Sequence, residues 1–130
     1  NLFLSMNRSL SRKLEEALLT WQLEQTLPKK RILEIYLNII EMGPGLRGVQ
    51  QGARLYFQKG ASYLNPLQAA HLASIIPAPR YYYKRFRKSL IPDEWAHKIR
   101  MLLTKINRHK RLPDEELEKA LKSELVIQDY

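Results

Sequence analysis

The feature that most constrains the fold is a helical repeat of apolar residues, which prolines and glycines interrupt at short intervals. Pro28 ends a first helical stretch that Ser9 or Ser11 can cap, and it suits the first turn of the stretch that follows. Asn65 supplies another cap, with Gln68 at the third helical position. Further helices are predicted over about 49–57, 66–76, from 93 and from 114. No alternating run is long enough for a sheet, so the sequence predicts an all-α fold.

The charge balance is strongly basic. The chain carries a formal net charge of +9, from 22 Lys and Arg against 13 Asp and Glu. Such a surplus predicts an anionic partner, and composition leaves nucleic acid, acidic lipid and a phosphorylated substrate open. Hydrophobic residues make up 45% of the 130 residues, enough for the core of one domain or a large piece of one. The absence of cysteine excludes disulfides, and the three histidines show no metal-ligand spacing.

The first predicted helix is apolar on two faces. At about 100° per residue, one face carries Leu14, Ala17, Leu18 and Trp21, and the opposite face carries Arg12, Glu16, Leu19 and Leu23. Such a helix is expected to be buried between other elements. The ionisation of Glu16 would then be tuned by burial and by Arg12, one turn earlier. The alternative is an ordinary salt bridge on a helix surface, which contributes little to stability.

Basic and aromatic side chains alternate between Arg80 and Lys88, in a stretch expected to be irregular up to about residue 89. A run of this composition can stack on nucleic-acid bases, lie at a lipid headgroup interface, or form a tyrosine-packed surface loop. Composition does not decide among these. Lys84 and Arg85 are therefore candidate contacts for a substrate or a membrane.

Three motifs follow one another along the chain: Arg12-Lys13-x-x-Glu16, then Lys30-Arg31-Ile32-Leu33-Glu34-x-Tyr36-Leu37-Asn38, then Gly45-x-x-Gly48-x-x-x-x-Ala53-x-x-Tyr56-Phe57-x-Lys59. In this order and spacing they resemble signatures of the peptidoglycan glycosyltransferases. These are the transglycosylase domains of bifunctional penicillin-binding proteins and of monofunctional enzymes. The resemblance covers roughly 1–83. Residues 1–130 would then form the C-terminal part of such a domain, with 84–130 as a helical extension.

The resemblance implies a lysozyme-like helical fold with a long cleft and a membrane-facing lobe. It also implies a reaction that joins lipid II units, with a glycan chain on a polyprenyl pyrophosphate as donor. Lipid II, the growing glycan strand and an anionic membrane surface would be the partners. The enzyme would work in the bacterial envelope, at the outer face of the cytoplasmic membrane. Nucleic acid is then not an expected partner.

By the same resemblance, Glu16 matches the second of the family's two glutamates, which is thought to support the pyrophosphate end of the donor. A divalent cation, Mg or Mn, is the one cofactor that the resemblance suggests, and no metal ligand is assigned. Arg12 and Lys13 match the cations of that motif. Fixed cations stabilise the charge that a pyrophosphate gathers as the sugar bond breaks. Arg47, in the glycine loop, is a further candidate substrate contact.

The sequence also departs from the family pattern. The motif with the other glutamate, the base that activates the acceptor hydroxyl, would precede Asn1, so the chain is expected to be inactive by itself. The opening residues carry no signal peptide and read as part of something longer. Gln50 and Gly52 stand where the family often has Glu and Ala.

Three other readings remain open. A basic helical module that binds nucleic acid or a membrane without catalysis would explain the charge, although not the ordered motifs between residues 12 and 59. A lysozyme-type hydrolase shares the fold class and a glutamate, but lacks the signature of 30–38 and needs no pyrophosphate-binding cations. A non-catalytic relative that serves as a scaffold is the third.

Overall fold

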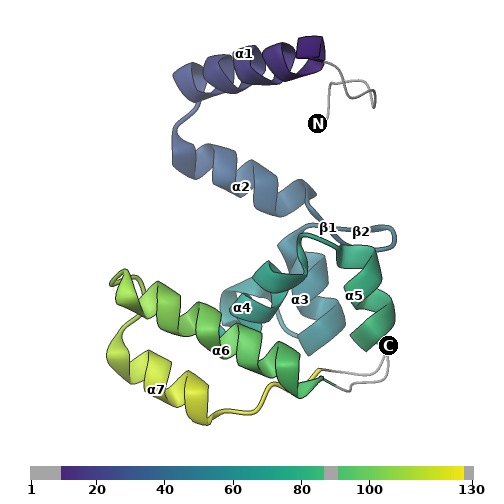
Figure 1. Ribbon diagram of the computed structural model, residues 1–130. Coiled ribbons are helices and arrows are strands. Elements are labelled where there is room, and N and C mark those ends of the chain that lie inside the picture. Colours follow the sequence, from purple (N-terminus) through teal and green to yellow (C-terminus); the bar gives the residue numbers. More distant parts are fainter. Residues whose placement is uncertain (1–9, 87–90, 128–130) are drawn as a thin grey trace. The chain divides into compact units, whose positions relative to one another are not determined.

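The computed structural model of the protein describes residues 10–86 and 91–127. It consists of two compact units, Asn1–Leu37 and Asn38–Tyr130. The described part contains seven α-helices and one short hairpin (Figure 1). The predicted all-α class is therefore correct, apart from two strands that are too short for a sequence pattern to reveal.

The first unit is built from helices α1 (Leu10–Thr26) and α2 (Lys29–Ile39), and α2 continues two residues into the second unit. The chain turns at Pro28, as predicted. The Leu27 amide still donates to the Leu23 carbonyl at 2.8 Å, whereas the Pro28 carbonyl already accepts from the Arg31 amide at 2.8 Å. Proline therefore ends one helix and opens the next within a few residues.

The apolar side chains of α1 are not buried. Leu14 and Trp21, on one face, are 68% and 61% exposed, and Leu19 and Leu23 on the opposite face are also exposed. Within the first unit, α1 is therefore not enclosed on two sides as expected, because the described residues of that unit form two helices and no third element that could cover both faces.

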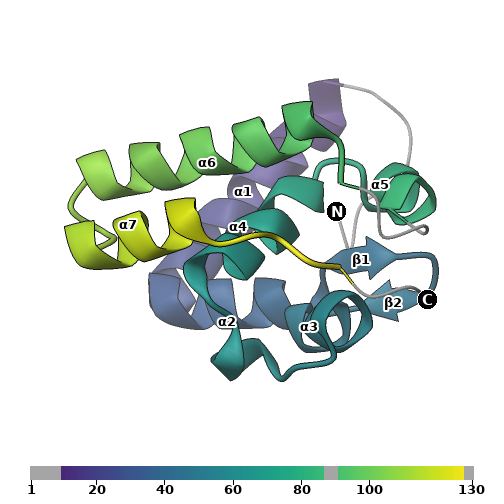
Figure 2. The same ribbon diagram turned by 90° about the horizontal axis from the view of Figure 1, so that it is seen from below.

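The second unit packs its helices around α4. Helix α4 contacts α3, α6 and α7, while α5 lies against strand β1 (Figures 1 and 2). The elements in chain order are β1 (Glu41–Gly43), β2 (Leu46–Arg47), α3 (Val49–Phe57), the 3₁₀ turn η1 (Ala61–Tyr63), α4 (Pro66–Ile75), α5 (Pro79–Phe86), α6 (Asp93–Arg108) and α7 (Asp114–Lys122).

The antiparallel hairpin of β1 and β2 depends on two glycines with positive φ. Gly45, in the turn, has φ +73°, and a Cβ there would meet nothing within 4 Å. Gly48, after β2, has φ 85° and ψ 148°, and its amide donates to the Ile40 carbonyl at 2.7 Å. A Cβ at Gly48 would lie 2.7 Å from the Asn38 carbonyl oxygen. Only glycine fits this conformation and this close approach.

Helix α4 begins with the predicted capping box. The Asn65 side chain accepts from the Gln68 amide at 2.8 Å, and the Gln68 side chain accepts from the Asn65 amide at 3.1 Å. Pro66 occupies the first helical turn, where a missing N–H costs nothing. Local sequence signals therefore determine where this central helix starts.

Helix α5 corrects the expectation of an irregular segment from Arg80 onward. Tyr82 and Phe86 stand one turn apart on α5, with their rings stacked at 5.7 Å and 11°. Both rings pack against Trp95 of α6, at centroid distances of 4.4 and 5.2 Å. Packing against a helix that follows later in the chain thus orders a stretch whose local sequence looks irregular. The expected irregular segment also included residues 87–89, which lie outside the described part of the structure.

A buried histidine stands at the centre of the core. The His71 imidazole is surrounded by the rings of Tyr56, Phe57, Phe86 and Trp95. Its Nδ1 accepts a hydrogen bond from the Trp95 indole at 3.1 Å, so the proton of the neutral ring is on Nε2. Within the described residues Nε2 has no hydrogen-bond partner. Burial lowers the pKa of His71 from 6.5 to about 4, and the ring therefore stays neutral.

A second close contact joins α3 to β1. A Cβ at Gly52 would lie 3.1 Å from Cγ and 3.2 Å from Cβ of Met42. One turn later on α3, the buried Tyr56 hydroxyl donates to the Met42 carbonyl at 3.2 Å. Glycine at position 52 lets the Met42 side chain fill this space.

Candidate functional site

The residues of the first motif lie at the start of α1. Because α1 begins at Leu10, Arg12 and Lys13 belong to its first turn, where backbone N–H groups lack helical partners and the helix dipole is positive. Lys13 is exposed, and the side chain of Arg12 lies outside the described part. Added cations at this end of a helix make an environment that favours a bound anion.

Glu16 follows Arg12 by one helical turn. Its side chain is half-buried, whereas that of the neighbouring Glu15 is exposed. Two adjacent carboxylates therefore differ in environment on the same helix. This difference makes Glu15 a matched reference for any role of Glu16.

The suggested divalent cation finds no ready set of ligands here. Among the described residues, no group of three or more His, Cys, Asp or Glu side chains is arranged to hold a metal ion. Glu16 alone would offer a single carboxylate.

Arg47 lies exposed on β2, opposite Glu41 in the hairpin register. The Glu41 carboxylate forms an ion pair with the Arg80 guanidinium at 2.7 Å, which ties β1 to α5. A second tie is steric, because the Tyr83 ring occupies the space that a Cβ at Gly43 would need, at 2.9 Å. The fold thus joins the hairpin that carries Arg47 to helix α5, which carries Lys84 and Arg85.

Lys84 and Arg85 are exposed in the last turn of α5. The Arg85 guanidinium donates to the Tyr81 hydroxyl at 3.2 Å. Of the three tyrosines before them, Tyr82 and Tyr83 pack inward, and Tyr81 is 57% exposed. The tyrosines of this segment therefore serve mainly to attach α5 to the rest of the unit.

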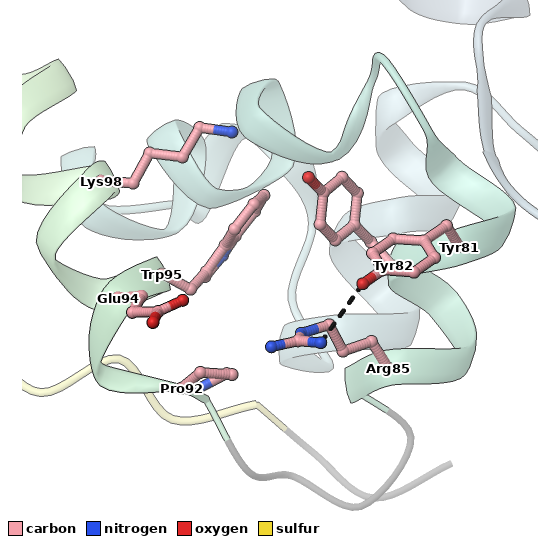
Figure 3. A pocket seen from close by; sticks show the side chains of 7 residues that line it. All are labelled: Tyr81, Tyr82, Arg85, Pro92, Glu94, Trp95 and Lys98. Carbon is pink, nitrogen blue, oxygen red and sulfur yellow. Dashed lines mark hydrogen bonds between the residues drawn. The ribbon is translucent and has the colours of Figure 1, made fainter.

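Sequence reasoning missed a cavity of about 520 Å³ between α5 and α6. The cavity lies between side chains of α5, among them Tyr82 and Arg85, and the start of α6, which contributes Glu94, Trp95 and Lys98 (Figure 3). The only local sequence feature that pointed to this cavity was the one-turn spacing of Glu94 and Lys98, which places both side chains on one face of α6. Their meeting with α5 depends on tertiary contacts that periodicity does not encode.

Comparison with known proteins identifies the lineage of the chain. A family model described as transglycosylase matches residues 1–107. The chain belongs to the transglycosylase family. The match begins before the three motifs and extends through most of α6, so it covers the first unit and the larger part of the second.

Curated relatives of this transglycosylase chain carry the name biosynthetic peptidoglycan transglycosylase. The protein from Methylobacillus flagellatus is 57% identical over 84 residues, which are 65% of this chain and 37% of the relative. The protein from Aromatoleum aromaticum is 45% identical over 102 residues, which are 78% of this chain and 44% of the relative. The chain thus spans less than half the length of these relatives.

A solved structure is also similar to this transglycosylase chain. Penicillin-binding protein 1A from Haemophilus influenzae matches with a TM-score of 0.63 and 28% sequence identity, over 80% of this chain and 15% of that protein. The helical fold is therefore that of a penicillin-binding protein's transglycosylase region. Along the described residues, no helix combines the length and apolar character that crossing a bilayer requires.

Proposed function

We propose that the chain is part of a peptidoglycan glycosyltransferase that polymerises lipid II into glycan strands. The observation that supports this most is the position of the first family motif at the start of α1, with two cations in the first turn and Glu16 one turn later. Family membership and the printed names of the curated relatives agree with it. Because the chain spans only part of those relatives, the activity is proposed for the whole protein.

In the proposed reaction, the bond between the donor sugar and its pyrophosphate breaks while the acceptor hydroxyl attacks the sugar. Negative charge then collects on the pyrophosphate. The first turn of α1 would stabilise that charge through Arg12, Lys13 and the free backbone N–H groups at the positive end of the helix dipole. Glu16, one turn after Arg12, would orient the guanidinium for this contact. The base that takes the acceptor's proton would come from the family's other glutamate.

The substrate is lipid-linked, so the whole protein is proposed to work at the outer face of the cytoplasmic membrane, in contact with anionic lipid. The exposed cations Arg47, Lys84 and Arg85 are the proposed contacts in the second unit. Each cation near an anionic surface contributes about 1 kcal/mol to binding. Replacing Lys84 and Arg85 with Ser should weaken co-sedimentation with anionic vesicles and leave binding to neutral vesicles unchanged.

The deciding experiment compares Glu16→Gln with Glu15→Gln in the full-length protein. Polymerisation of lipid II should fall by about 10²-fold or more in the Glu16 variant, as for loss of one charge-stabilising group in a reaction site. The Glu15 variant should keep near-normal turnover, because that carboxylate is exposed. Circular dichroism should give the same helix content for both. Near-normal turnover of Glu16→Gln would refute the assigned role.

A further inference from the structure

The cavity between α5 and α6 presents opposite charges across one open space. Arg85 reaches into it from α5, and Glu94 reaches into it from the first turn of α6 (Figure 3). Within the described residues these two side chains do not form an ion pair with each other. A cation and an anion that face a common space without meeting are complementary to a molecule that carries both charges.

The walls of this pocket are held rigidly. Trp95 is fixed by its indole hydrogen bond to the buried His71, and the Tyr82 ring packs against it with a centroid distance of 4.4 Å. The hydrogen bond to the Tyr81 hydroxyl also restrains the Arg85 guanidinium. Less conformational freedom is therefore lost when a ligand binds, which favours binding.

The aromatic side chains lower the polarity of the pocket but do not offer an open stacking surface. Trp95 is only 7% exposed, and the Lys98 ammonium lies 4.6 Å from the centre of its ring. Tyr82 has Phe86 stacked on it. A sugar ring would need a free aromatic face, so the geometry disfavours a glycan here. Nearby apolar surface does strengthen charge–charge contacts with a small ligand.

We propose that this pocket binds a short peptide with a free ammonium and a free carboxylate. The carboxylate would bind the Arg85 guanidinium, whose fork of N–H donors matches two carboxylate oxygens. The ammonium would bind Glu94. Lys98, beside Trp95, adds positive charge to the pocket and favours the carboxylate. The site lies entirely in the second unit.

The test is an NMR titration of the chain with trialanine, which carries one ammonium and one carboxylate. The two tryptophans of the chain provide a reporter and an internal control. The Trp95 ring lines the pocket and its ring-proton resonances should shift, while those of Trp21, in the first unit, should not. N-acetyltrialanine and trialanine amide each lack one charge, and each should bind about tenfold more weakly.

Variants then assign each charge. Arg85→Gln should weaken trialanine binding about tenfold, whereas Lys105→Gln, an exposed cation elsewhere on α6, should not change it. Glu94→Gln should weaken trialanine binding and leave N-acetyltrialanine unaffected. Both pocket side chains are exposed, so the variants should fold normally.

Three results would overturn the proposal. The first is no shift of the Trp95 ring-proton resonances throughout the titration. The second is equal weakening by Arg85→Gln and Lys105→Gln, which would indicate unspecific charge attraction. The third is binding of glucuronic acid as tight as that of trialanine, with no effect of N-acetylation, because the site would then recognise an acidic sugar.

Discussion

Apolar residues make up similar proportions of the two units, but the units use them in opposite ways. In the second unit, apolar residues from the hairpin and from helices α3 to α7 form one buried core around His71. In the first unit, large side chains such as Leu14, Trp21 and Leu33 remain exposed. The second unit therefore has the packing of an independently folded body, whereas the described helices of the first unit enclose no core of their own.

This contrast separates two roles of hydrophobic sequence. Burial of a large apolar side chain stabilises a fold by about 1.5–3 kcal/mol, but only where another element covers it. The helices of the second unit cover one another, so its stability depends on individual contacts. The first unit gains little from its apolar residues within the described structure. Substitutions should therefore affect stability in one unit far more than in the other.

The sharpest test of the contrast is a pair of aromatic truncations. Phe86→Ala removes a ring that is 0% exposed and should reduce the free energy of unfolding by about 3–5 kcal/mol. Trp21→Ala removes a larger ring that is 61% exposed and should change it by no more than about 0.5 kcal/mol. Urea unfolding followed by circular dichroism measures both. Equal losses would show that the first unit is as well packed as the second.

Two glycines of the hairpin provide the next test. Gly48→Ala should cost about 3 kcal/mol, because it combines a glycine-only conformation with a contact of 2.7 Å to the Asn38 carbonyl oxygen. Gly45→Ala should reduce the free energy of unfolding by only about 1 kcal/mol, because the added Cβ strains the backbone but contacts no neighbouring atom. Thermal unfolding of the two variants would separate close packing from backbone strain. A Gly48 variant as stable as the Gly45 variant would contradict the close approach.

His71 makes the stability of the second unit depend on pH. Burial lowers its pKa to about 4, so below pH 6.5 the unfolded chain binds a proton that the folded chain rejects. The contribution of the neutral His71 ring to the free energy of unfolding is complete above pH 6.5 and is lost as the pH falls toward 4. Between pH 7 and pH 5 the expected loss is about 2 kcal/mol.

Two kinds of variant isolate this pH effect. His71→Gln keeps an acceptor for the Trp95 indole but does not titrate, so its unfolding free energy should vary less between pH 7 and pH 5. His97→Gln is the control, because His97 is exposed on α6. If the wild-type slope persists in His71→Gln, another group is responsible for it.

The smallest expected effect concerns two exposed ion pairs of equal length, both 2.7 Å. Arg80→Gln breaks the pair with Glu41 that joins two elements of the second unit, and should cost about 0.5–1 kcal/mol. Arg31→Gln breaks a pair with Glu34 inside α2, and should cost about 0.3 kcal/mol. Both losses should shrink in high salt. Urea midpoints at low and high salt would rank them, and the reverse order would show that joining elements adds nothing.

The parts of the fold that could be predicted from the sequence are those with local causes. The turn at Pro28, the capping box at Asn65 and the extent of α3 all follow from neighbouring residues. Helix α5 could not be predicted, because the packing of Tyr82 against Trp95 orders it. The exposure of α1 also escaped prediction, since a two-faced apolar pattern indicates a need for cover but not whether cover is present.

The candidate functional residues also differ in whether local sequence or tertiary packing brings them together. Arg12, Lys13 and Glu16 could be proposed from the sequence because one helical turn relates them. Their roles remain predictions. The pocket with Arg85 and Glu94 could not be proposed, because it exists only where α5 meets α6, and no periodic pattern links the two helices.

The contact between Gly52 and Met42 has a consequence for how this lineage can diverge. Alanine at position 52 would need Met42 to give way by a few tenths of an ångström, whereas a smaller residue at position 42 would leave room for it. The two positions should therefore change in a preferred order, with position 42 shortening before position 52 gains its methyl group. In homologous chains, glycine at position 52 should accompany a long side chain at position 42. One steric contact would thus appear across the family as a pair of residues that vary together.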